Sequence, residues 1–128
     1  MPSRPVAPVP AASLTKVAER TLAGASADLA LRNFLDEFYR APRLEMLLEE
    51  PPLTGARVTD CFLAAAADEL GTTYFGRVPL WASHENRHLT EPHFGFSTPL
   101  GRAHALIATP SAFRERNLFI GEDALKRA

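Results

Sequence analysis

The chain has 128 residues, a formal net charge of −1 and a hydrophobic fraction of 46%, which suit one compact domain with a modest core. The near-neutral charge argues against a generally basic nucleic-acid-binding protein, and no apolar run approaches the roughly 18 residues of a membrane span. The one cysteine, Cys61, excludes a disulfide framework and fits a reducing compartment. We therefore expect a cytoplasmic protein without a membrane partner.

Residues 1–12 contain four prolines and form the low-complexity part of the chain. Prolines at this density prevent regular helix and sheet, so we expect a disordered, proline-rich arm. They also interrupt any apolar stretch of the kind that a signal peptide needs. A single helical domain is expected over residues 13–128.

Two helices are predicted directly after the arm. Ser13 is suited to cap the first, which we expect to stop near Gly24, and Ser26 is suited to cap the second, over residues 26–41. In the second helix apolar residues recur at one-turn spacing, which predicts one buried face. The residues of this face are Leu31, Phe34, Leu35 and Phe38.

A short helix and a long helix are predicted next. The short one covers residues 42–50, with Leu44, Leu47 and Leu48 on one side. The long one runs from about residue 56 to residue 70 and ends at Gly71. Its four consecutive alanines favour helix and permit close approach of a second helix. Cys61 lies on its apolar side and is predicted to be a buried structural residue.

The remaining chain is predicted to be less regular. Residues 72–98 contain repeated prolines and glycines but are rich in aromatic residues, so we expect an irregular segment packed on the core. A helix is predicted from Thr98 to just before Pro110, then a short turn, and a final helical turn or two over residues 121–128. The predicted fold class is all-α, one compact domain of about six or seven helices, several of them short.

Residues 84–88 spell H-E-x-x-H, the signature of zinc peptidases. On an α-helix, His84 and His88 would share one face and bind the same Zn²⁺, and Glu85 would activate the metal-bound water as general base. His93 is a candidate third ligand. A minimal zinc-dependent hydrolase is therefore an alternative function.

The surroundings of this motif disfavour the zinc alternative. Pro79 and Pro92 leave room for about two helical turns between them. A helix that continued to His93 would contain Pro92 in its interior, at a cost of about 3 kcal/mol. The turn itself is almost wholly polar, as a solvated surface is, so the favoured interpretation includes no cofactor.

A DNA-binding autoregulator is a second alternative. Residues 14–38 can be drawn as a helix-turn-helix around Gly24. The second helix of that unit would carry Asp28, Asp36 and Glu37, which repel phosphate. DNA is therefore disfavoured as a partner.

Three stretches resemble a family of small bacterial proteins, and the resemblance extends over about residues 27–128. They are N-F-L-D-E-F-Y-R-A-P at 33–42, W-x5-R-x-L-x-E-P-x-F at 81–94, and T-P-S-A-F-R-E-R-N-L-F-I-G-E-D-A-L-K-R-A at 109–128. Members of this family are often encoded beside a nucleotidyltransferase-fold protein of the abortive-infection toxin type. The resemblance thus implies an antitoxin-like protein that binds and restrains such an enzyme.

The residues that carry the second and third stretches are interpreted as structural. We expect Trp81, Leu89 and Phe94 to anchor the irregular segment, and Arg87 to pair with Glu91 or with carbonyls at a helix C-terminus. In relatives we expect residues other than metal ligands in place of the two histidines and Glu85. The full set is Trp81, Arg87, Leu89, Glu91, Pro92, Phe94, Phe113, Arg114, Arg116, Asn117 and Phe119.

Acidic residues are concentrated in residues 27–70, which carry nine acidic and four basic side chains. They are either solvated helix faces or a face offered to a basic partner. We favour a non-enzymatic, antitoxin-like interaction protein whose acidic helices bind the nucleotide-binding cleft of a nucleotidyltransferase-fold toxin. The sequence leaves homo-oligomerisation open. The predicted partner-binding residues are Asp36, Glu37, Glu45, Glu49 and Glu50.

Overall fold

The computed structural model describes residues 12–126, so the predicted arm lies outside the described residues apart from Ala12. Within this range the fold is all-α, as predicted, and no helix is both long and apolar enough to cross a membrane. The elements, in chain order, are α1 (Leu14–Leu22), α2 (Ala27–Arg40), α3 (Glu45–Leu48), α4 (Arg57–Phe75), the 3₁₀ turns η1 (Leu80–Ser83) and η2 (Glu85–Arg87), β1 (His93–Phe94), α5 (Pro99–Ala108), α6 (Ser111–Arg114) and β2 (Leu118–Phe119).

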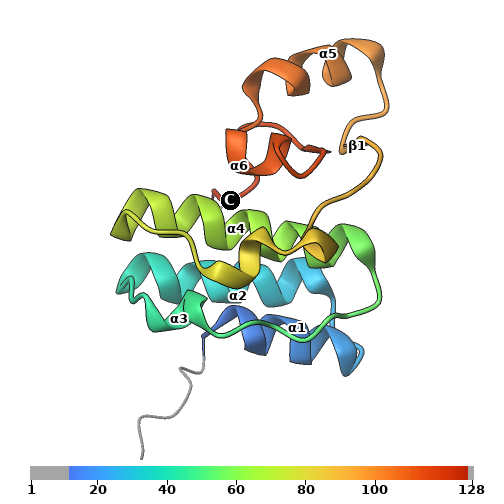
Figure 1. Ribbon diagram of the computed structural model, residues 1–128. Helices are drawn as coiled ribbons and strands as arrows, with labels where there is room; N and C mark the ends of the chain where they lie inside the picture. The colour runs from blue at the N-terminus through green and yellow to red at the C-terminus, as the bar shows by residue number, and fades with distance from the viewer. Residues whose placement is uncertain (1–11, 127–128) are drawn as a thin grey trace, which may run out of the picture.

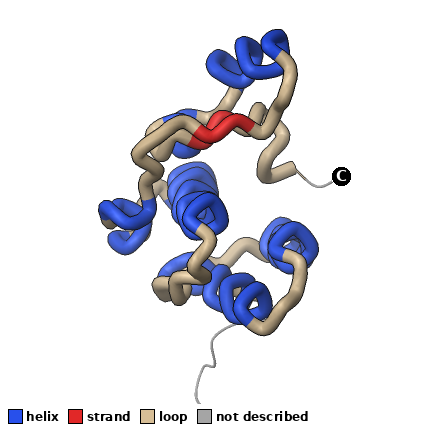
Figure 2. Tube along the Cα trace, turned by 90° about the vertical axis from the view of Figure 1, so that its right-hand side faces the viewer, coloured by secondary structure: helices blue, strands red, loops and turns tan. Residues whose placement is uncertain are grey.

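Helix α4 lies at the centre of the molecule (Figure 1). Helices α1 and α2 lie on one side of it and pack against each other. Figure 2 shows α1, α2 and α4 almost end-on. On the other side α4 contacts α6 and β2, while η1 and η2 pack along it. Helix α5 stands at the far end of the molecule from α1 and α3 (Figure 1).

The predicted helix caps of α1 and α2 are confirmed, and α5 begins where it was expected to begin. The Ser13 hydroxyl accepts a hydrogen bond from the Lys16 amide at 3.1 Å, and Ser26 accepts one from Leu29 at 3.3 Å. Thr98 caps α5 in the same way. Each cap satisfies a backbone N–H that has no partner inside the helix, which fixes where the helix begins.

The core surrounds α4, with α1 and α2 on one side and η1, α6 and β2 on the other. Phe34, Leu35 and Phe38 of α2 are buried, as predicted, and Leu31 is half-buried. The alanines at 64–67 of α4 are all buried in this core, because a methyl group lets neighbouring segments come close. Cys61 is fully buried beside them.

Helices α1 and α2 form an antiparallel hairpin (Figure 1). In a DNA-binding helix-turn-helix the two helices cross at about 90–120°. The arrangement seen here instead directs their apolar faces at each other and at α4, where Leu14, Val17 and Phe34 are buried. The geometry therefore differs from the helix-turn-helix that residues 14–38 suggested.

The predicted end of the long helix at Gly71 is wrong. Helix α4 continues to Phe75 and is capped by Gly76, whose φ of 68° is in the left-handed region that favours glycine. Gly71 serves another purpose, since a Cβ there would collide with the carbonyl oxygen of Arg77. The chain turns back tightly onto α4 at this point, and the irregular segment begins four residues later than expected, at Gly76.

Two further predictions about the C-terminal half are wrong. The sequence indicated no strand, but His93 pairs with Leu118 and Phe94 with Phe119 as a short parallel ladder within the described residues. Residues 122–125 form turns rather than a final helix. These turns bring Leu125 into the core, where its carbonyl oxygen accepts a hydrogen bond from the Tyr39 hydroxyl at 2.6 Å.

Candidate functional site

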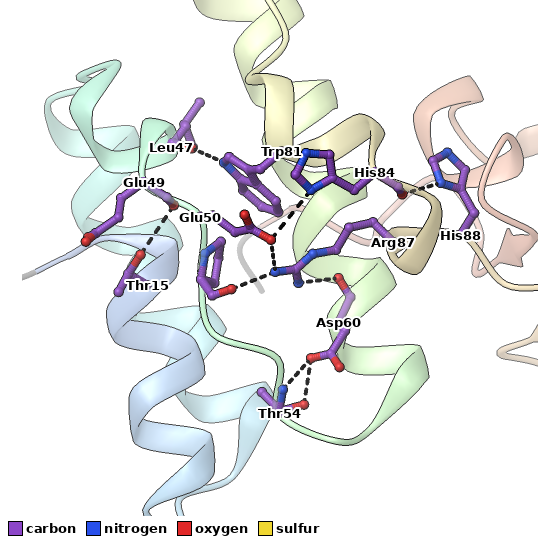
Figure 3. Close-up of polar contacts among 11 residues, drawn as sticks. Thr15, Leu47, Glu49, Glu50, Thr54, Asp60, Trp81, His84, Arg87 and His88 are labelled. Carbon is purple, nitrogen blue, oxygen red and sulfur yellow. Dashed lines mark hydrogen bonds and ion pairs between the residues drawn. The ribbon is translucent and has the colours of Figure 1, made fainter.

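Arg87 is the centre of a buried polar network that joins three segments (Figure 3). Its guanidinium donates to the carbonyl oxygen of Pro51 at 2.6 Å and to that of Asp60 at 3.2 Å. It also lies 3.4 Å from the Glu50 carboxylate and 4.9 Å from the centre of the Trp81 ring. The predicted pairing with Glu91 or a helix C-terminus is wrong, because Arg87 points inward to the loop before α4 and to its first turn.

Trp81 and Asp60 fix the segments around this network. The Trp81 indole N–H donates to the carbonyl oxygen of Leu47 at 2.9 Å, which ties η1 to α3. The Asp60 carboxylate accepts hydrogen bonds from the amide and the hydroxyl of Thr54 at 2.8 and 2.7 Å. The loop between α3 and α4 is thereby held from both sides, and η1 has a rigid support.

A groove of about 550 Å³ lies between α3 and η1, and we call it the α3–η1 groove. Leu80 on its rim is 89% exposed, and Leu48, which we expected to pack beside Leu47, is also exposed. The floor is the buried Trp81. The residues that line the groove are Leu48, Glu50, Arg77, Val78, Pro79, Leu80, Trp81 and His84.

His84 separates this groove from a second, more polar hollow of about 540 Å³. Its Nδ1 lies 3.7 Å from the Glu50 carboxylate, and both side chains are partly exposed. Arg57 crosses to the irregular segment and donates to the carbonyl oxygen of His88 at 2.7 Å. The polar hollow is lined by Arg57, His84, Glu85, Asn86, His88 and Thr90.

The H-E-x-x-H residues do not lie on an α-helix. His84 has extended backbone angles between the two 3₁₀ turns, so His84 and His88 are not on one helical face. The Nδ1 of His88 contacts the carbonyl oxygen of His84 at 2.9 Å, while His93 lies in β1. Among residues 12–126 no three His, Cys, Asp or Glu side chains are grouped as metal ligands. The geometry on which the zinc alternative depends is therefore missing from the described residues.

The predicted acidic residues are spread over α2, α3 and the loop that follows. Asp36 and Glu37 line the hollow between α1 and α2, where Glu37 pairs with Arg40 at 3.0 Å. Glu45 and Glu49 are exposed on or next to α3. Glu50 lines the α3–η1 groove, and Figure 3 shows Glu49 and Glu50 pointing in different directions. Three of the five carboxylates thus lie at α3 and two on α2.

The tail residues of the family resemblance surround a second buried arginine. Arg116 pairs with Asp68 at 2.9 Å and donates to the carbonyl oxygens of Ala82 and Ala112, both at 2.7 Å. Phe113 is fully buried against Phe62. Arg116 therefore connects the C-terminal segment to α4 and to η1.

Of the other residues that carry the family resemblance, some make contacts inside the protein and some are exposed. Asn117 has a φ of 64° and donates from its amide to the carbonyl oxygen of Leu89 at 2.8 Å. Phe94 and Phe119 stack at 5.2 Å across the ladder. Leu89, Phe94 and Phe119 are half-buried, and the exposed members are Glu91, Pro92 and Arg114.

Sequence reasoning missed the exposed apolar residues that now mark the surface. Leu80 and the two α5 residues Leu100 and Ile107 are more than four-fifths exposed. Leu80 was placed in a segment expected to pack on the core. A signal was present for α5, because a short helix with apolar residues on several sides cannot bury all of them against one neighbour.

No family model, no curated protein and no solved structure matches this chain. The resemblance to the antitoxin-like family remains an expectation from the sequence. The α3–η1 groove and the charged residues around it are therefore the features from which we infer function.

Proposed function

We propose that this protein acts by binding another protein at the α3–η1 groove. The observation that carries the proposal is the nearly complete exposure of Leu80 on the rim of an apolar groove. An apolar side chain in water is stabilised when a partner covers it, by about 1.5–3 kcal/mol for a residue of this size. Clustered apolar residues with polar neighbours are typical of protein-binding surfaces.

The rigidity of the groove supports the same function. Trp81 is bonded to α3, and Arg87 is bonded to the loop before α4, so both walls are held in place before any partner arrives. A surface that is already ordered loses less conformational entropy on binding than a mobile one does. The groove is therefore suited to hold a partner's apolar side chains.

The charge around the groove indicates the chemistry of the partner. Glu50 lines the groove, and Glu45 and Glu49 are exposed on or next to α3, so the acidic side chains at this end of the molecule favour a basic partner surface. The family resemblance implies a nucleotidyltransferase-fold toxin as that partner, whose nucleotide-binding cleft would be basic. On this proposal the protein is antitoxin-like and restrains the enzyme by occupying the cleft.

Co-expression with the product of the neighbouring gene tests this function. We expect the tagged protein to retain that product through purification, and a charge-reversed variant to lose most of it. Asp36 is half-buried and Glu50 contacts the buried Arg87, so the reversal uses the other three carboxylates, which are exposed. The variant is Glu37→Lys, Glu45→Lys and Glu49→Lys.

A second charge-reversed variant is the matched control. It carries the same change in net charge at three exposed acidic residues outside α2 and α3, and we expect it to retain the partner. If both variants retained the partner equally well, the acidic residues of α2 and α3 would not be part of the binding surface. Absence of capture by the wild-type protein would contradict the function itself. The control is Glu91→Lys, Glu115→Lys and Glu122→Lys.

A further inference from the structure

His84 lies where the α3–η1 groove meets the polar hollow, and its side chain lines both. Its Nδ1 is 3.7 Å from Oε2 of Glu50, and both side chains are partly exposed. Figure 3 shows that the same oxygen also faces the buried Arg87, whose Nη2 lies 3.4 Å away. Because His84 follows η1 and Glu50 follows α3, the contact joins the two walls of the groove where it borders the polar hollow.

The contact between His84 and Glu50 depends on whether the imidazole carries a proton. A neutral ring at 3.7 Å makes no direct hydrogen bond with a carboxylate, whereas an imidazolium at this distance forms an ion pair with it. Imidazole is the side chain that ordinarily takes up a proton between about pH 5 and 8. Proton uptake by His84 therefore adds an ion pair between the two walls and a positive charge to the lining of the groove.

The permanently charged residues of the two linings balance each other. The α3–η1 groove contains Glu50 and Arg77, and the polar hollow contains Glu85 and Arg57. Without the histidines, each lining therefore has one negative and one positive charge and a sum of zero. The protonation state of the histidines decides whether this face of the molecule is neutral or cationic.

His88 is the second histidine of this face, and it lines the polar hollow but not the groove. Its Nδ1 is 2.9 Å from the carbonyl oxygen of His84, which can only accept, so Nδ1 carries a hydrogen and Nε2 is the atom that takes up a proton. Arg57 donates to the carbonyl oxygen of His88 at 2.7 Å and lies beside it in the hollow. His88 therefore changes the charge of the hollow, and His84 is the histidine that changes the charge of the groove.

We propose that protonation of His84 is a pH switch that weakens partner binding at the α3–η1 groove as the pH falls. The inference rests on the proposed function, in which the surface of the partner is basic. An imidazolium in the lining repels such a surface and pairs with the carboxylate of Glu50. Binding of the partner therefore disfavours the proton on His84, and by linkage the affinity of the complex increases with pH.

NMR titration of the purified full chain tests the switch without a partner. We expect the carboxylate carbon of Glu50 to shift between about pH 6 and 8 together with the ring of His84. His84→Gln stays neutral and should abolish this shift, while His104→Gln, at an exposed histidine of α5, should leave it unchanged. A Glu50 resonance that does not shift in the wild-type protein, or that shifts equally in His84→Gln, would overturn the inference.

Titration calorimetry with the partner enzyme at about pH 6 and 8, in a buffer of low ionic strength, tests the effect on binding. We expect the wild-type protein and His104→Gln to bind several-fold more weakly at the lower pH, and His84→Gln to lose most of this difference. The comparison between variants removes the titration of the partner's own groups. The same pH dependence in the wild-type protein and in His84→Gln would overturn the inference and leave the proposed function intact. No binding at the higher pH would contradict the proposed function, and with it the effect on binding, whereas the NMR result stands independently.

Discussion

Two buried arginines connect segments that are distant in the chain. Arg87 and Arg116 each donate to two backbone carbonyl oxygens, those of Pro51 and Asp60 in one case and of Ala82 and Ala112 in the other. The planar guanidinium offers several N–H donors in a fixed geometry, so one side chain can bond carbonyls from two different segments at once. Each arginine also faces one carboxylate, which offsets part of the cost of burying its charge.

The neighbouring residues Arg114 and Arg116 give a matched test of this role. Arg116→Met leaves Asp68 and two carbonyls without their donor, so we expect the free energy of unfolding to fall by about 3 kcal/mol. Arg114 is exposed, and Arg114→Met should change it by less than about 0.5 kcal/mol. Urea denaturation measures both. Similar losses in the two variants would contradict the assigned role of Arg116.

The importance of Trp81, Arg87 and Arg116 could be predicted from the sequence, but their partners could not. The family resemblance pointed to these residues. Their partners are mostly backbone carbonyls, which every residue carries, so residue type gives no information about which carbonyl is reached. For Arg87 a nearby carboxylate in sequence, Glu91, suggested a pair, yet Glu50 is the carboxylate that folding brings within 3.4 Å.

At the scale of elements, helix α4 determines where the irregular segment lies. Its last turn and the chain that follows pass close to Gly71, and Gly76 reverses the chain direction. Sequence reasoning treated Gly71 as a helix end because glycine often follows a helix. The close approach of Arg77, which depends on tertiary structure, explains why glycine stands inside the helix instead.

Replacement of Gly71 tests this close approach. In Gly71→Ala the new Cβ meets a backbone carbonyl that cannot rotate away, so we expect a loss of about 1–3 kcal/mol in unfolding free energy although alanine favours helix. At Gly95 a Cβ would make ordinary contacts with Ile120 at 3.4 Å and beyond. Gly95→Ala should therefore be tolerated, and a thermal melt compares the two. A Gly71→Ala protein as stable as the wild type would refute the assignment.

The H-E-x-x-H stretch shows that this motif can bind zinc only when an α-helix places both histidines on one face. The letters match a zinc signature, but His84 and His88 have extended backbone and only Glu85–Arg87 between them form a 3₁₀ turn. We expect a chelator to leave the melting temperature of the purified protein unchanged. Elemental analysis provides the control, and stoichiometric zinc that is lost in His84→Ala would reinstate the hydrolase alternative.

At the scale of the whole molecule, the sequence predicted the all-α fold and two of the helix caps, but not the surface that matters for function. The caps and the apolar face of α2 follow from local spacing, which the sequence contains directly. The α3–η1 groove combines residues 48–50 with residues 77–84, and its walls are positioned by Trp81 and Arg87. Such a surface follows from packing and has no local pattern.

The exposure of α5 and of Leu80 gives the molecule two apolar surfaces on different elements. Single exposed apolar residues are common on proteins and need no explanation. Here each belongs to a group, in a groove or on a helix face, and the carboxylate of Glu50 lines the groove. On our account the groove is the binding surface for a partner enzyme.

The dissociation constant of the complex with the purified partner enzyme tests the central claim most directly. Leu80 and Ile107 are similarly exposed, so Leu80→Ala and Ile107→Ala remove comparable apolar surface from the groove and from α5. Titration calorimetry should show a roughly tenfold weaker complex for Leu80→Ala, about 1.4 kcal/mol, and an unchanged one for Ile107→Ala. An unchanged dissociation constant for Leu80→Ala would contradict binding at the α3–η1 groove.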